Sequence, residues 1–117
     1  MNKESYLHKY AKIVLKSWLL KKPSLIGVDE IFRIDIEKQF CSKGFILFIP
    51  DLAIYTINGV NIFVEIYHKN KVSFEKLHNI RNYLILYQYD VRCYEISAYW
   101  IMSQIKIPKD LNINKIL

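Results

Sequence analysis

An Asn-Gly dipeptide at positions 58 and 59 separates two runs of β-prone residues, and this feature constrains the fold more than any other. Asn-Gly between such runs is the strongest short-range signal for a β-hairpin. The first run, residues 49–55, reads Ile-Pro-Asp-Leu-Ala-Ile-Tyr, and the second, residues 60–67, reads Val-Asn-Ile-Phe-Val-Glu-Ile-Tyr. We therefore expect the two runs to be neighbouring antiparallel strands.

The hairpin allows two registers. A two-residue turn would pair Ile57 with Val60, and Asp51 and Glu65 would then point to opposite faces because side chains alternate along a strand. A three-residue loop, residues 57–59, would place Asp51 directly opposite Glu65. We expect the second register, because it gathers one entirely apolar face, made of Leu52, Ile54, Val60, Ile62, Val64 and Ile66.

The expected register sets two negative charges against each other. Like charges directly opposite one another destabilise a sheet, so Asp51 and Glu65 need a neutralising partner. A divalent cation, Mg²⁺ or Mn²⁺, takes oxygen ligands of this kind. Glu4 is a candidate third ligand or water bridge, and equally a helix-start residue paired with His8. The opposite register would leave the acids solvated and favour a plain interaction domain.

Composition bounds the class of protein. The chain has 117 residues, which suits one domain, and it is 52% hydrophobic, which is too apolar for a disordered tail. It has no apolar run of about 18 residues and no signal-peptide pattern, so we expect no membrane contact and a cytoplasmic location. Cys41 and Cys93 form no C-x-x-C pattern and are expected to be buried or free thiols in a reducing compartment.

The charge balance favours an anionic partner. The net charge is +6, from 17 Lys and Arg against 11 Asp and Glu, and a basic balance of this kind is typical of nucleic-acid binding. Lys9, Lys12 and Lys16 line one side of a predicted helix and form either a solvated face or a row that contacts phosphates. At this size, recognition is expected to need a homodimer or a larger complex.

Hydrophobic periodicity predicts a mixed α/β domain. Helices are expected at residues 3–21, 73–88 and 97–105, and strands at 30–40, 45–57, 60–67 and 91–96. Ser73 is the expected N-cap of the second helix. Pro50 is expected to cause a bulge or an edge, because it has no N–H for the ladder. The fourth strand follows the third through a helical crossover, so it should pair parallel with an existing strand.

In order and spacing, these segments resemble the PD-(D/E)xK nuclease superfamily, and more narrowly a small CoiA-like branch of it. The matching residues are Pro50-Asp51, Glu65-Ile66, Val72, Glu75-Lys76, Ile80-Arg81 and 94–97, with Glu4, His8 and Lys12 on the first helix. The resemblance covers residues 4–97 and leaves 98–117 as a C-terminal appendage. It implies a single domain, residues 1–117, with a restriction-endonuclease-like α-β-β-β-α-β core and a mixed four-stranded sheet.

The same resemblance implies a metal-dependent DNA endonuclease, or a nuclease subunit, that hydrolyses phosphodiester bonds. Asp51 and Glu65 would hold Mg²⁺. The motif places a lysine two residues after the second acid, where this chain has Tyr67, which supplies no positive charge. Lys76, in the first turn of the following helix, is expected to replace it, with Lys69 as the second candidate.

If neither lysine reaches the acids, the chain would be a catalytically inactive binding module on the same scaffold. Such a module would act in phage–host conflict or as a subunit of a nucleic-acid complex. In either case the partner is expected to be nucleic acid, most simply DNA. The nucleic acid is expected to contact Tyr67, at the end of the third strand, and His68 and Lys71, which follow that strand.

Overall fold

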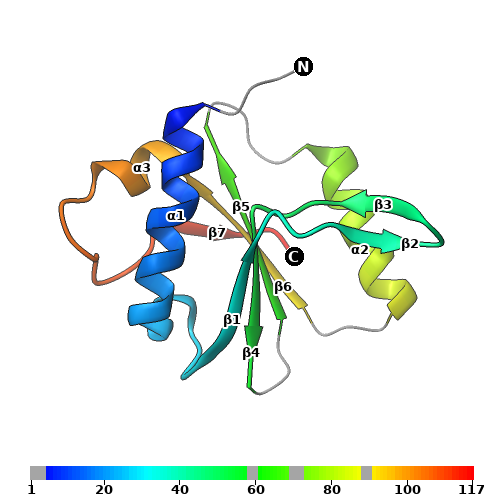
Figure 1. The fold of residues 1–117 in the computed structure, drawn as a ribbon, viewed down its shortest axis with the longest axis horizontal. Coiled ribbons are helices and arrows are strands. Elements are labelled where there is room, and N and C mark those ends of the chain that lie inside the picture. The colour runs from blue at the N-terminus through cyan, green and yellow to red at the C-terminus, as the bar shows by residue number, and fades with distance from the viewer. Residues whose placement is uncertain (1–4, 58–60, 69–72, 88–90) are drawn as a thin grey trace.

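The computed structural model describes residues 5–57, 61–68, 73–87 and 91–117. These residues form a mixed α/β fold with helices on both sides of a five-stranded sheet (Figure 1). The elements are, in chain order, α1 (Tyr6–Lys21), the 3-10 helix η1 (Pro23–Ile26), β1 (Ile31–Ile36), β2 (Phe40–Ser42), β3 (Phe45–Phe48), β4 (Leu52–Thr56), β5 (Asn61–Tyr67), α2 (Phe74–Tyr87), β6 (Val91–Ser97), α3 (Ala98–Ser103) and β7 (Ile113–Lys115). Within those ranges, no helix is both long and apolar enough to cross a membrane.

The described strands of the main sheet have the order β1-β4-β5-β6-β7. β1, β4 and β5 form the predicted antiparallel meander, and β6 pairs parallel with β5 after the α2 crossover, also as predicted. The prediction of four strands is wrong, because β7 pairs antiparallel with β6 and adds a fifth. Residues 98–117 are therefore part of the fold rather than an appendage: Ile113 lies opposite Ile96, and the Cys93 N–H donates to the Leu117 carbonyl at 3.1 Å.

The predicted hairpin register is confirmed. Leu52 pairs with Val64 and Ile54 pairs with Ile62, and the same register places Asp51, one residue before β4, opposite Glu65. The turn itself, residues 58–60, lies outside the described residues. The two acids are therefore neighbours at one end of the hairpin.

Two predicted strands are shorter than expected, for local backbone reasons. The strand expected at residues 45–57 is divided at Pro50, so that β3 pairs with β2 in a separate two-stranded ribbon while β4 joins the main sheet. Pro50 has no N–H with which to continue a ladder. The strand expected at 30–40 ends at Ile36, where the following residue, Glu37, has a left-handed conformation with φ 54°.

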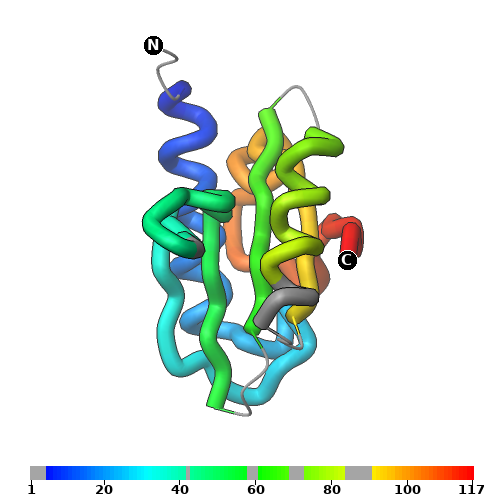
Figure 2. The backbone as a smooth tube through the Cα atoms, turned by 90° about the vertical axis from the view of Figure 1, so that its right-hand side faces the viewer, coloured from blue at the N-terminus to red at the C-terminus, as the bar shows by residue number. Residues whose placement is uncertain are grey.

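Both faces of the sheet are covered. On one face, α1, η1 and α3 pack against the apolar side chains predicted from the hairpin register. The buried residues of the resulting core include Leu15, Leu19, Leu52, Ile54, Ile62, Val64, Ile66, Ile96 and Ile101. On the other face, α2 and the β2–β3 ribbon cover a smaller cluster of Phe48, Ala53, Phe63, Ile80, Tyr83 and Cys93. In Figure 2, α2 runs in front of β5 and β6. Glu65 lies on this second face, at the end of β5 next to the start of α2, whereas the Asp51 carboxylate lies at the adjoining end of the sheet, where α1 reaches it.

Only one side of α1 is buried, which predicts a contrast between two leucines in this helix. Leu15 is 0% exposed and Leu20 is 49% exposed. We expect Leu15→Ala to lower the free energy of unfolding by about 2–5 kcal/mol, because it removes buried methyl groups and leaves a cavity. Leu20→Ala makes the same change of helix propensity and should cost about 0.5 kcal/mol or less. Urea unfolding measures both, and equal losses would contradict this packing.

Candidate active site

Asp51 is fixed to the neighbouring strand by a backbone hydrogen bond. The Ile66 N–H donates to Asp51 Oδ2 at 2.6 Å, and the Asp51 side chain is buried. Glu65, the residue before Ile66, is also buried. Pro50 ends one ladder and β4 begins after Asp51, so the aspartate lies at a break between two sheets, where its side chain is free to turn toward β5.

One face of α1 supplies two nitrogen donors to Asp51. His8 Nε2 lies 2.7 Å from the Ile66 carbonyl oxygen and 3.4 Å from Asp51 Oδ2. Because a carbonyl oxygen only accepts, Nε2 must bear the proton and donate it. Lys12, one turn later, places Nζ 3.5 Å from Asp51 Oδ1 and also contacts the Glu37 carboxylate. Ser5 caps this helix, since its Oγ accepts from the His8 N–H at 3.1 Å.

Lys76 reaches Glu65 from the other side of the sheet. Its Nζ lies 2.8 Å from Glu65 Oε1 and donates to Oε2 at 2.9 Å. The predicted cap positions this lysine in the first helical turn, because Ser73 Oγ accepts from the Lys76 N–H at 3.1 Å. The first candidate lysine thus lies at the acidic pair. Lys69, the second, is outside the described residues.

The two acids differ in their pKa values. Burial alone would raise the pKa of Asp51, but hydrogen bonds from His8 and from the Ile66 N–H outweigh it and hold that pKa below its ordinary value. Burial and the Asp51 charge raise the pKa of Glu65 to about 8, which the Lys76 ammonium only partly offsets. The hydrogen bond to Asp51 raises the pKa of His8. The surroundings therefore shift the pKa values of the two carboxyl groups in opposite directions.

Two acidic residues near the site were missed from the sequence. Glu95 pairs with Glu65 across the parallel ladder of β5 and β6, so their side chains share one face, and Glu95 is buried. Its strand alternates Cys93, Glu95 and Ser97 on that face, a signal that becomes readable once the parallel register is known. Glu37 follows β1 and contacts Lys12. Nothing in the local sequence indicates this contact, which depends on the packing of α1 on the sheet.

The other predicted site residues lie in varied surroundings. Lys12 does not belong to a solvated or phosphate-contacting row, because it is only 3% exposed and faces Asp51; Lys9 is exposed and Lys16 half-buried. Tyr67 ends β5 and is half-buried, and His68 Nε2 lies 3.0 Å from the Tyr99 hydroxyl. Two further candidates, Glu4 and Lys71, fall outside the described residues.

The two carboxylates of the acidic pair could supply two oxygen ligands to a small divalent cation. In the described ranges, no group of three or more His, Cys, Asp and Glu side chains is placed to hold a metal ion. Mg²⁺ is commonly held by one or two carboxylates, with water and substrate phosphate at its other positions. Glu65 Oε1 is buried and accepts no hydrogen bond from the described residues, although Lys76 Nζ lies nearby. Asp51 and Glu65 are the residues that could hold such an ion.

The pKa values predict how stability depends on pH. Glu65 has its pKa raised from 4.5 to about 8, so between these values the folded chain keeps a proton that the unfolded chain has released. Stability should therefore fall as pH rises through this window, and the raised pKa of His8 acts in the same direction. We expect a lower melting temperature at about pH 8 than at about pH 5. Glu65→Gln should make this dependence shallower, and an unchanged slope would contradict the assignment.

Comparison with known proteins gives no match: no family model, no curated protein and no solved structure matches this chain. No relative therefore supplies an activity, a substrate or a partner by similarity. The site itself consists of Asp51 and Glu65, opposed across the hairpin of β4 and β5, with His8 and Lys12 beside the first acid and Lys76 beside the second.

Proposed function

We propose that the chain is a metal-dependent nuclease of the PD-(D/E)xK type, with a restriction-endonuclease-like core, that hydrolyses phosphodiester bonds of DNA. The observation that supports this most directly is the ion pair between Lys76 and Glu65, with Nζ 2.8 Å from Oε1. Tyr67 occupies the usual lysine position, and a lysine from the next helix supplies the missing charge at the same carboxylate. The element order from α1 to β6 agrees with the αβββαβ core of that superfamily once the β2–β3 ribbon is treated as an insertion.

The residues divide the chemistry among them. Asp51 and Glu65 would hold Mg²⁺ or Mn²⁺, which polarises a phosphate oxygen and lowers the pKa of a bound water. Lys76 provides a fixed positive charge beside Glu65, suited to stabilising negative charge that develops on the phosphate. The Ile66 N–H and His8 orient Asp51. Lys12 links Asp51 to the end of β1 through Glu37.

The setting of the reaction follows from the same proposal. The net charge of +6 suits DNA, and the size of the chain suits action as a homodimer or as a subunit of a larger complex. Cys41 and Cys93 are both free thiols, which accords with a cytoplasmic location. Phosphate contacts are assigned to the exposed Lys9 and the half-buried Lys16 on α1, and to His68, which follows β5.

A second candidate function has its own supporting observation. His8 and Lys12 already contact Asp51, at 3.4 Å and 3.5 Å, so the acidic pair is partly neutralised without any metal ion. A module that only binds nucleic acid could keep the pair in this state permanently. The two functions differ in whether a divalent cation binds and whether DNA is cut.

Cleavage assays test the nuclease directly. Purified protein with Mg²⁺ or Mn²⁺ should cut plasmid or single-stranded DNA. Asp51→Asn should lower the rate at least about 100-fold by removing a metal ligand, and Lys76→Gln should do the same by removing charge stabilisation. Lys106→Gln, which removes the same charge from an exposed position, is the matched control and should cleave normally. A parent protein that cuts no DNA with either ion would favour the binding module.

Thermal stability tests metal binding independently of activity. A ligand that binds only the folded state raises the melting temperature, so Mn²⁺ should raise that of the parent by several degrees. The rise should disappear in Asp51→Asn and persist in Lys106→Gln. An equal rise in the parent and in Asp51→Asn would place the ion elsewhere, and no rise in the parent would argue against a metal site.

A further inference from the structure

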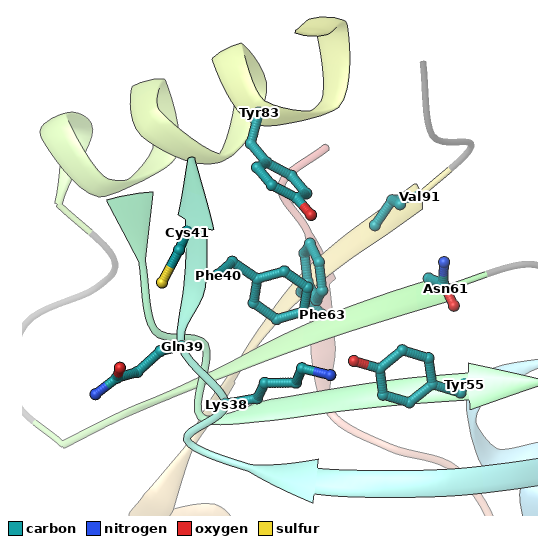
Figure 3. Close-up of a pocket in the computed structure, with 9 residues that line it drawn as sticks. All are labelled: Lys38, Gln39, Phe40, Cys41, Tyr55, Asn61, Phe63, Tyr83 and Val91. Carbon is teal, nitrogen blue, oxygen red and sulfur yellow. The ribbon is translucent and has the colours of Figure 1, made fainter. Parts of the chain in front are cut away.

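A cavity of about 280 Å³ lies on the same face of the sheet as Glu65, between β4, β5, the β2–β3 ribbon and α2 (Figure 3). Glu65 shares this face, because the lining residues Asn61 and Phe63 precede it in β5 by four and two residues, and side chains two or four apart on a strand point the same way. At the rise of a β-strand, four residues span about 13 Å. The cavity is therefore within reach of a nucleic-acid strand that lies across the acids.

The wall of the cavity combines aromatic rings with hydrogen-bonding groups. Its aromatic residues are Phe40, Tyr55, Phe63 and Tyr83, and its polar residues include Lys38 and Asn61. Phe63 and Tyr83 are buried, whereas Phe40 and Tyr55 are partly exposed and present ring surface to an entering group. A volume of 280 Å³ is small for a binding pocket and suits a single ring system rather than a peptide or a large cofactor.

The Tyr55 hydroxyl is the unexplained group in this cavity. It is buried and has no hydrogen-bond partner among the described residues. A buried hydroxyl without a partner costs the folded protein stability, and a ligand that supplies the hydrogen bond would remove this cost. Figure 3 shows the hydroxyl directed toward the end of the Lys38 side chain. That side chain is 43% exposed, so it can swing outward and open access to the hydroxyl.

Positive charge surrounds the Tyr55 ring. The Arg33 guanidinium carbon lies 4.5 Å from the ring centroid, and Lys38 Nζ lies 5.4 Å from it. Lys38 Nζ is also 5.9 Å from the Phe40 centroid. Asp35 faces both cations, at 3.3 Å from Arg33 and 3.9 Å from Lys38, so two positive charges oppose one negative charge and leave an excess of one. An anionic chain is favoured at this edge.

We propose that this cavity receives one unpaired nucleobase of a bound DNA strand. The base would stack on the rings of Phe40 and Tyr55 and accept hydrogen bonds from the Tyr55 hydroxyl and the Lys38 ammonium. This inference rests on the proposed function for its substrate, and adds that the protein takes up an unstacked base at a second position on the same face. Lys38 only donates, and the Tyr55 hydroxyl can donate, so the keto and ring-nitrogen edge of guanine, which presents two acceptors, would suit this pair.

Binding to an abasic strand separates base recognition from phosphate attraction. The full chain, in EDTA so that no DNA is cut, is titrated with a short single-stranded DNA and with an abasic strand of equal length and charge. We expect the normal strand to bind at least about fivefold more tightly, because stacking on aromatic residues is sequence-tolerant and strong. Equal affinities would overturn the proposal.

Variants then assign the difference to the cavity. Tyr55→Phe keeps the ring and should reduce the preference for the normal strand about threefold, the usual effect of one hydrogen bond. Lys38→Gln should also reduce the preference. Lys43→Gln, an exposed position that does not line the cavity, removes the same charge and should weaken both strands equally. A preference unchanged in Tyr55→Phe would overturn the proposal, and a thermal melt shows that each variant is folded.

Alkylation of a cysteine localises the base. Cys41 is exposed and lines the cavity, whereas Cys93 is buried and burial raises its pKa to about 12, so alkylation reports on Cys41. The normal strand should slow the reaction and the abasic strand should not; equal rates with both would count against the cavity. These readouts do not need cleavage. Base preference without cleavage would keep the cavity and remove the nuclease, whereas cleavage without base preference would do the reverse.

Discussion

The repulsion between two carboxylates placed opposite each other is the constraint on which the rest of the structure depends. Asp51 and Glu65 are set together by the hairpin register, and both are buried. Each is matched by a cation from a different layer: Lys12 in α1 beside Asp51, and Lys76 in α2 beside Glu65. The two helices lie on opposite sides of the sheet (Figure 1). The ion pairs of Asp51 with α1 and of Glu65 with α2 therefore connect both helical layers to the same end of the sheet.

The pair is asymmetric because, among the described residues, a backbone N–H donates to Asp51 and none donates to the Glu65 side chain. Asp51 accepts the Ile66 N–H at 2.6 Å, and this bond favours the ionised form. Glu65 has the Lys76 ammonium instead, but it is buried next to the Asp51 charge, and its pKa is raised to about 8. Sites in which two carboxyl groups are driven to different protonation states are typical of acid–base chemistry. The asymmetry arises here from the donors beside Asp51 and from the burial of Glu65 next to the Asp51 charge.

Local patterns predicted much of this site, and long-range packing determined the rest. The apolar set from Leu52 to Ile66 selected the register, and with it the opposition of the acids. The cap at Ser73 placed Lys76 in a first helical turn. In contrast, helical spacing identified a lysine row on α1 without indicating that Lys12 would be buried against the sheet. β7 is too short to show an alternating pattern, so its pairing with β6 was not predictable from the sequence. The cavity combines residues from β2, β4, β5, α2 and β6, and no local signal relates them.

The position of Lys76 on the crossover has a consequence for how this fold can vary. Lys76 and Ile80 are one helical turn apart, so they lie on the same side of α2, and Ile80 is fully buried against the sheet. The packing of Ile80 against the sheet therefore fixes the height of α2 above it, and with it the position of the Lys76 ammonium over Glu65. Ile80 is a core residue, and such residues are normally replaceable by apolar side chains of similar size. Here it also determines where the Lys76 ammonium lies relative to Glu65. A larger or smaller side chain at position 80 would therefore change both the packing of α2 on the sheet and the distance between the Lys76 ammonium and Glu65.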